Sequence, residues 1–358
     1  MSVLPSNLPE RATHAGPPAT RHRAFALLWC IAAAILWLFV LGHVDPVGYD
    51  FHSFHATSRA WWGLSPDATG APLDLNTPIW PVLLWPLAVL PLSWAWAAWN
   101  VIGLACLSAI LIVTPASNTR KLWLAGACLV TTPALAEWVT GQLAWPLALL
   151  ITLAWRRESP ILLGLAVILK PPLALLALAL PWSLTWRAGA VSVGLLVLSL
   201  PVVGVSAWQA WLALGGQVTW LSGLHNQSLW AWAGRMALPT LPALALSDFP
   251  AWLVLVVLGA GLTLLPLVVR AHRDARWGLA VLWSLALSPL GWTYYLPLAL
   301  GPMLASLRGP WAWIALACFL VPPPALPWWP ILTLSLGGTV ALWCGFSART
   351  GVSYRDGS

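Results

Sequence analysis

The sequence is poor in charge, and above all in acidic residues. Only 8% of its 358 residues are Asp, Glu, Lys or Arg, whereas 60% are hydrophobic. A soluble domain carries about 25% charged residues, so this composition excludes a water-soluble globular fold. Apolar runs of this length and number are typical of a polytopic membrane protein, whose helices satisfy their own backbone hydrogen bonds in lipid.

Cysteine is also scarce, and its placement excludes two kinds of site. All five cysteines lie within apolar runs, and no two of them form a C-x-x-C pair. We therefore interpret them as small core residues, and we expect neither a cysteine zinc site nor a disulfide framework. They are Cys30, Cys106, Cys128, Cys318 and Cys344.

The apolar runs predict an all-α fold with about 12 transmembrane helices, within a range of about 9–13. The predicted spans are 24–42, 78–113, 121–136, 143–155, 159–169, 171–184, 188–206, 251–269, 277–290, 292–307, 310–322 and 327–346. They form a single membrane domain over residues 21–347, between a disordered cytoplasmic tail at 1–20 and a second cytoplasmic tail at 348–358. The first span is interpreted as a retained signal anchor rather than a cleaved signal peptide.

The basic residues predict the orientation. With the N-terminus inside, only Arg59, Lys170 and Arg235 of the 17 basic residues fall on the outer side. This distribution accounts for the net charge of +7 without nucleic-acid binding. We expect a multi-pass plasma (inner) membrane protein with both termini cytoplasmic and two long outer loops, 43–77 and 207–250, which carry the functional residues.

Four of the ten acidic residues lie in the first outer loop. Asp50 is followed by His52, His55 and Arg59, and a carboxylate just beyond a span could act as a general base. A solvated loop acid is the alternative. Asp50 and the two histidines could also hold a divalent metal ion on one helical face, so metal dependence is left open.

The remaining three acids of this loop have ordinary surroundings. Pro, Gly and Asn residues flank them, which is typical of turns. They are Asp45, Asp67 and Asp74.

Lys170 is one of two lysines in the chain, and it falls between two apolar helices on the outer side. An ammonium group there costs several kcal/mol unless it is paired, and a lipid phosphate is the anion available at that depth. Pro171 and Pro172 break the helix beside it and free backbone groups to line a cavity. A snorkelling lysine is the alternative.

Three further outward segments combine polar and aromatic side chains that could hold a sugar or a phosphate. Ordinary tight turns and interfacial aromatic anchors are the alternatives. The candidate residues are Gln142 in the first segment, His225, Asn226, Gln227 and Arg235 in the second, and Trp292, Tyr294 and Tyr295 in the third.

In this order, the motifs resemble glycosyltransferase family 87. The resemblance covers roughly residues 24–310 and depends on the set of motifs and their spacing. The motifs are Asp50-Phe51 followed by "ATSRAWWGLSP", the apolar "PVLLWPLAVLPLSWAWAAWNVIGL", Gly141-Gln142, Lys170-Pro171, Asn226-Gln227-Ser228, and Ser288-Pro289-x-x-Trp292.

The resemblance implies a GT-C-like membrane hexosyltransferase. Such an enzyme moves a hexose, often mannose, from a polyprenyl-phosphate carrier to a glycan or lipid acceptor, and we expect inversion at the anomeric carbon. It implies Asp50 as the general base, Lys170 and Arg235 as the phosphate-binding residues, and Gln142, Asn226 and Gln227 as residues that orient the sugar or acceptor.

Two positions depart from the family pattern. His55 stands where we expect tyrosine, and Tyr294-Tyr295 stand where we expect histidines. The donor and acceptor therefore stay open. A transporter or flippase of a lipid-linked sugar and a non-catalytic membrane scaffold remain alternatives. Scarce midplane charge and polar outer loops favour the enzyme over the transporter.

Overall fold

The computed structural model describes residues 19–43, 48–64, 76–215, 218–219, 221, 223, 226–238 and 244–306. Every extended regular element among the described residues is a helix; turns and short loops join the helices, and Asn226 and Trp292 form an isolated antiparallel bridge. The expectation of an all-α fold is thus confirmed for this part of the chain. The predicted spans 310–322 and 327–346, and both predicted tails except the start of α1, lie outside it.

Eighteen helical elements follow one another in the described residues. The α-helices are α1 (Ala19–His43), α2 (Tyr49–Trp61), α3 (Trp80–Leu83), α4 (Trp85–Ala88), α5 (Leu92–Val113), α6 (Asn118–Val130), α7 (Thr132–Thr140), α8 (Ala144–Arg157), α9 (Pro160–Leu169), α10 (Trp182–Val203), α11 (Val205–Gly215), α12 (Leu229–Ala237), α13 (Ala251–Arg270), α14 (Arg273–Leu287) and α15 (Leu300–Ser306). The 3₁₀ helices are η1 (Pro171–Leu178), η2 (Leu246–Asp248) and η3 (Thr293–Ala299).

Among the described residues, four helices are long and apolar enough to cross a bilayer: α1, α5, α10 and α13. Only 11% to 22% of each apolar window is buried by protein, so lipid must cover the remainder. A fifth span arises if α6 and α7, which meet at 56°, count as one broken helix. The predicted count of about 12 spans is therefore not confirmed.

The structure shows helices within the segments predicted as outer loops and a break within one predicted span. The outer loop 43–77 contains helix α2, and 207–250 contains most of α11 together with α12 and η2. The predicted span 171–184 is η1 followed by the first turn of α10. Hydrophobicity alone does not place a short apolar segment such as 171–184, because a run of fewer than about 17 apolar residues can belong to a buried helix as well as to part of a span.

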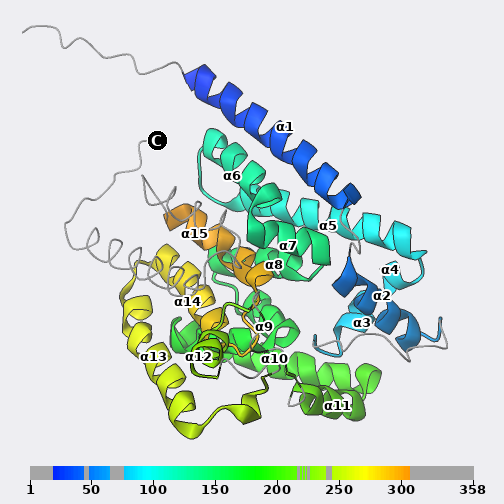
Figure 1. The fold of residues 1–358 in the computed structure, drawn as a ribbon, viewed down its shortest axis with the longest axis vertical. Coiled ribbons are helices and arrows are strands. Elements are labelled where there is room, and N and C mark those ends of the chain that lie inside the picture. Colours follow the sequence, from blue (N-terminus) through cyan, green and yellow to red (C-terminus); the bar gives the residue numbers. More distant parts are fainter. Residues whose placement is uncertain are drawn as a thin grey trace, which may run out of the picture.

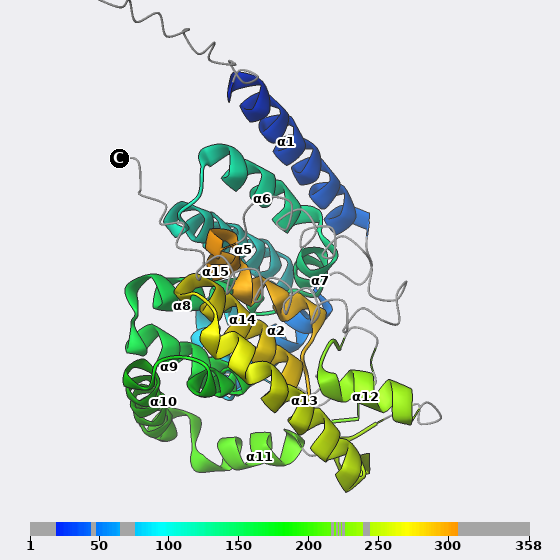
Figure 2. The same ribbon diagram turned by 90° about the vertical axis from the view of Figure 1, so that its left-hand side faces the viewer.

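Helix α1 lies along the edge of the bundle, where it packs on α6 (Figures 1 and 2), and α8 lies near the middle in the view of Figure 1. Leu147, Ile151 and Trp155 of α8 are fully buried. The helix packs on α5, α9, α15 and η3. The turn at its N-terminus, which carries Gln142, is therefore held by a well-buried helix.

Candidate active site

A cavity of ≈ 1120 Å³ lies between the start of α2, the α7–α8 turn, the α9–η1 break, α11 and the α14–η3 turn. Its walls are formed by segments far apart in the sequence. Six of the expected site residues line it: Asp50, Gln142, Lys170, Trp292, Tyr294 and Tyr295.

Asp50 is placed by the turn that starts α2. Gly48 precedes the helix with φ 73°, a left-handed conformation that favours glycine. Its N–H donates to the carbonyl of Val139 at the end of α7, at 2.6 Å. The next residue, Phe51, is buried and stacks on Trp99. Asp50 thus lies in the first turn of α2, where the helix dipole favours a carboxylate.

Gln142 is presented by a tight turn between α7 and α8. Gly141 ends α7 with φ 71°, and a side chain there would collide with Trp96 and Phe51. Glu137 holds the turn from inside, because its Oε1 accepts the N–H of Ala144 at 2.9 Å. Glu137 was not among the site residues predicted from the sequence. The only feature of the sequence that points to Glu137 is the presence of an acidic residue one turn before Gly141 in an apolar helix.

Four of the lining side chains form a continuous chain of contacts. Gln142 Nε2 donates to Asp50 Oδ2 at 2.6 Å, and the Tyr295 hydroxyl donates to Gln142 Oε1 at 3.3 Å. The Nζ of Lys170 lies 3.8 Å from the centroid of the Tyr295 ring, a cation–π distance. A carboxylate and an ammonium group therefore lie at the two ends of one ordered chain on one cavity wall.

The surroundings of Asp50 change its acidity. Burial raises the pKa of Asp50 above its ordinary value, because desolvation disfavours the charged form. The hydrogen bond from Gln142 lowers the pKa and partly offsets this. A carboxyl group with a raised pKa is a stronger base once ionised, which suits proton transfer from a hydroxyl.

Lys170 occupies the break predicted between two apolar helices. Helix α9 ends at Leu169, and Pro171 and Pro172 start a 3₁₀ helix instead of continuing it. The break frees backbone groups, and Trp80 Nε1 donates to the carbonyl of Leu169 at 3.1 Å. The two prolines and Lys170 line the cavity, as the sequence leads one to expect.

The α14–η3 turn contributes an aromatic wall. Trp292 and Tyr294 stack with ring centroids 6.0 Å apart and planes 15° apart. Tyr295 packs edge-on against Tyr294, with ring centroids 4.8 Å apart. Flat faces of this kind provide apolar contact area, while the tyrosine hydroxyls can form hydrogen bonds.

The other expected residues of α2 do not join this group. His55 is buried, and its Nε2 donates to the Leu90 carbonyl at 3.1 Å. Arg59 donates to the carbonyls of Ala88 and Leu64. His52 is exposed. Within the described ranges, no three His, Cys, Asp or Glu side chains are placed to hold a metal ion together.

Residues of the second outer segment lie behind the cavity wall. Asn226 is fully buried, and its Nδ2 donates to the carbonyls of Leu221 and Pro289 at 3.1 and 2.7 Å. The N–H of Gln227 donates to the Gly291 carbonyl at 2.8 Å. The Asn-Gln-Ser motif thus packs on the Ser-Pro-x-x-Trp turn and supports it.

Arg235 stabilises the same loop through hydrogen bonds to its backbone. Its Nη1 donates to the carbonyls of Gly223 and Asn226 at 3.0 and 3.2 Å, and the residue does not line the cavity. His225 lies outside the described residues. These backbone contacts could not be read from the sequence, since a buried polar cluster and a ligand-binding cluster have the same composition.

Comparison with known proteins identifies the family. The profile of glycosyltransferase family 87 matches residues 75–292, more than half of the chain. The match includes Gln142 and Lys170, begins after Asp50, and ends before Tyr295. No curated protein and no solved structure matches the chain significantly. The chain therefore belongs to glycosyltransferase family 87 and is a membrane glycosyltransferase, which uses a sugar donor and an acceptor.

Proposed function

We propose that this enzyme transfers a hexose, with mannose as the first candidate, from a polyprenyl-phosphate carrier to a glycan or glycolipid at the outer face of the membrane. The observation that carries the proposal is the chain Asp50–Gln142–Tyr295–Lys170 along one cavity. It joins a group that can accept a proton to a group that can hold a phosphate.

In the proposed reaction, Asp50 takes the proton of an acceptor hydroxyl. The hydroxyl oxygen forms a bond to the anomeric carbon of the hexose while the bond from that carbon to the phosphate oxygen breaks. The electron pair leaves with the phosphate, whose charge Lys170 stabilises in a site of low dielectric constant. Attack in line with the leaving group inverts the anomeric centre.

We assign the roles of the other residues according to their contacts. The amide nitrogen of Gln142 donates to Asp50, and its amide oxygen accepts from Tyr295. We therefore propose that Gln142 positions the base instead of binding sugar. Arg235 is directed to loop carbonyls, so we propose Lys170 as the principal phosphate ligand. Trp292 and Tyr294 offer stacked faces to a sugar ring.

The lining of the cavity favours a lipid-linked donor. Trp211 and Leu212 of α11 line it, and Leu212 is 66% exposed, so this wall continues onto an apolar surface. An isoprenoid tail needs such a surface, whereas a nucleotide-sugar does not. The volume also leaves room for an acceptor beside the sugar phosphate.

The test is transfer of labelled hexose from a polyprenyl-phosphate donor in membranes that carry the wild type or Asp50→Asn. We expect transfer by the wild type and a loss of about 10²–10⁴-fold in the variant, because general-base catalysis contributes that much. Asp67→Asn is the matched control, since the sequence places Asp67 in the same predicted outer loop and gives it no catalytic role, and it should keep full activity.

A folded, inserted Asp50→Asn protein with full activity would contradict the assigned base. Absence of transfer by either protein across several donors and acceptors would favour the flippase or scaffold alternatives. Transfer from a nucleotide-sugar alone would contradict the proposed donor.

A further inference from the structure

A second pocket, of ≈ 280 Å³, lies at the other end of the helices that hold the first. Pro160 at the start of α9 lines the second pocket, and Leu169 at its end lines the Asp50 cavity. Helices α8 and α14 also run between the two sites. The second pocket is therefore on the opposite side of the bundle, and the proposed transfer reaction does not use it.

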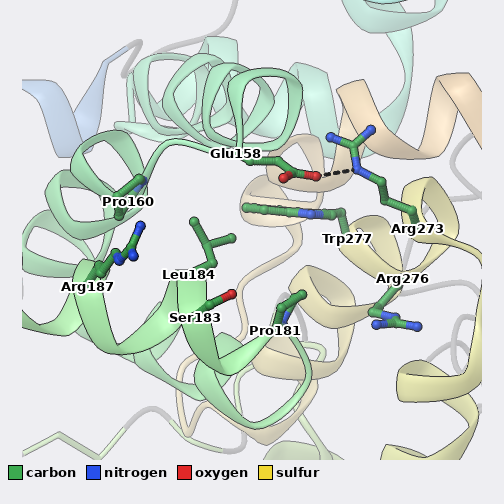
Figure 3. A pocket seen from close by; sticks show the side chains of 9 residues that line it. All are labelled: Glu158, Pro160, Pro181, Ser183, Leu184, Arg187, Arg273, Arg276 and Trp277. Atoms are coloured by element: carbon green, nitrogen blue, oxygen red, sulfur yellow. Dashed lines mark hydrogen bonds and ion pairs between the residues drawn. The ribbon is translucent and has the colours of Figure 1, made fainter.

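The pocket has a positive lining. Figure 3 shows Arg187 of α10 on one side and Arg273 and Arg276 of α14 on the other, with the ring of Trp277 between them. Among the described residues, Glu158 is the one acidic side chain that lines it. The N-termini of α10 and α14, where backbone N–H groups lack helical partners, add further positive potential. An anion is the ligand that this lining fits.

The arginines differ in how far the protein already uses them. Arg273 Nε contacts Glu158 Oε1 at 2.8 Å, and its Nη2 donates to the Trp155 carbonyl. Arg276 donates weakly to the Ala271 carbonyl, at 3.3 Å. Within the described part of the chain, Arg187 makes no hydrogen bond or ion pair, and its guanidinium lies 5.6 Å from the ring of Trp186. Its donors are available to a ligand.

The surface next to the pocket identifies the kind of anion. Helix α10 rises from it with Trp182 73%, Trp186 50%, Val197 57% and Leu198 73% exposed. Only 11% of its apolar window is buried, the smallest share of the four long helices. Arginine and tryptophan at the start of a lipid-facing helix mark the bilayer interface. An anion bound here would have acyl chains that lie along α10.

We propose that this pocket binds the headgroup of an anionic phospholipid, with the phosphate between Arg187 and Arg276 and an acyl chain along the exposed face of α10. Basic pockets between membrane helices on the cytoplasmic side hold anionic headgroups in this way. The lipid would fasten the starts of α10 and α14 at one membrane surface while the opposite ends of α8, α9 and α14 support the transfer site.

The experiment titrates phosphatidylglycerol into the full-length protein in zwitterionic detergent and follows the thermal unfolding midpoint, which rises when a ligand binds the folded state. We expect saturable stabilisation by phosphatidylglycerol and none by phosphatidylcholine or inorganic phosphate. Arg187→Gln should weaken the apparent Kd about fivefold, and Arg187→Gln with Arg276→Gln about 30-fold, because each interfacial arginine contributes about a factor of five.

The matched control is Arg156→Gln with Arg157→Gln, which removes the same charge from exposed residues at the end of α8 that do not line the pocket. This variant should bind as the wild type does. Equally weakened binding in the control variant would show general attraction to a basic surface and would overturn the proposal. Unchanged binding by the Arg187 variants would exclude this pocket and would overturn it too. Equal stabilisation by inorganic phosphate would overturn the lipid as its occupant. Arg187 makes no hydrogen bond within the described residues, so its substitution should leave the lipid-free midpoint unchanged.

Discussion

At the scale of single residues, Gln142 shows how the structure refines what the sequence indicates. A glutamine after a glycine at a helix start suggests a residue that binds a sugar. In the structure, however, both the amide nitrogen and the amide oxygen of Gln142 contact protein side chains. Its donor holds the carboxylate of Asp50, and its acceptor takes the hydroxyl of Tyr295. Gln142 therefore fixes the direction in which Asp50 presents its free oxygen, a role that depends on a partner 153 residues away.

Replacing Gln142 with Leu should move the pH dependence of transfer. Burial raises the pKa of Asp50, and the hydrogen bond from Gln142 lowers it. Loss of that hydrogen bond should therefore raise the pKa of Asp50 further. The base acts only when ionised, so activity falls as the pH drops through this pKa. We expect the acidic limb of kcat/KM to move up by about one pH unit in Gln142→Leu.

The control for this shift is Tyr295→Phe, which removes the hydroxyl but leaves the Gln142 donor on Asp50. It should move the limb less than Gln142→Leu does. An unchanged limb together with a raised KM for the sugar donor would show that Gln142 binds substrate and does not tune the base.

Lys170→Met should weaken binding of the donor. Methionine keeps an apolar stem of similar length but removes the ammonium group, and a hydrogen bond to a charged partner contributes about 1.5–3 kcal/mol. We expect the KM for a polyprenyl-phosphate hexose to rise about 10–100-fold, with partial recovery in Lys170→Arg. Steady-state kinetics in membranes measures this.

The other lysine provides the control. Lys121 Nζ donates to the Ile112 carbonyl and does not line the cavity, so Lys121→Met should leave the KM unchanged. A Lys170→Met enzyme with an unaltered KM would return Lys170 to the snorkelling alternative.

At the scale of elements, breaks and turns between helices build the site. The Lys170–Pro171–Pro172 break was predictable, because proline cannot continue a helix and the charge is isolated. The α7–α8 turn was predictable as a turn from Gly141. The contact of Tyr295 with Gln142 and Lys170 was not predictable, since it depends on how η3 packs against α7 and α8.

Gly141→Ala should disturb both stability and activity. Gly141 has φ 71°, and an added Cβ would meet the Trp96 ring and the side chain of Phe51, the neighbour of Asp50. We expect a loss of about 1–3 kcal/mol in the free energy of unfolding and reduced transfer. Thermal unfolding and the transfer assay measure the two effects.

Gly189→Ala is the comparison variant. Nothing lies within 4 Å of a Cβ built at this helical glycine, so alanine should be neutral or slightly stabilising there. If Gly141→Ala behaved like Gly189→Ala, the tight contact of the α7–α8 turn with α2 would not matter for the site.

At the scale of the whole molecule, the fold separates two polar sites by the thickness of the helix bundle. The sequence predicted this relation from charge alone, placing Lys170 outside and Arg187, Arg273 and Arg276 inside. In the structure these groups lie at opposite ends of α8, α9 and α14. The number of spanning helices was less predictable, because short apolar helices such as α9 need not reach both membrane surfaces.

The predicted orientation can be tested with introduced cysteines. Leu246 lies at the Asp50 cavity and Arg157 at the opposite end of α8, and both are exposed. A membrane-impermeant maleimide should label Leu246→Cys in intact cells, and Arg157→Cys only after lysis. The reverse pattern would place the transfer site in the cytoplasm.

Asp50 and Lys170 have different proposed roles in one cavity, since Asp50 takes a proton and Lys170 holds the phosphate. The most direct measurement is the kinetics of hexose transfer by Asp50→Asn, with the polyprenyl-phosphate donor varied at saturating acceptor. We expect a kcat lower by about 10²–10⁴-fold and a donor KM close to that of the wild type, because the lost group acts in proton transfer and not in phosphate binding. An unchanged kcat with a raised donor KM would contradict it, since Asp50 would then be a binding residue and the base would lie elsewhere.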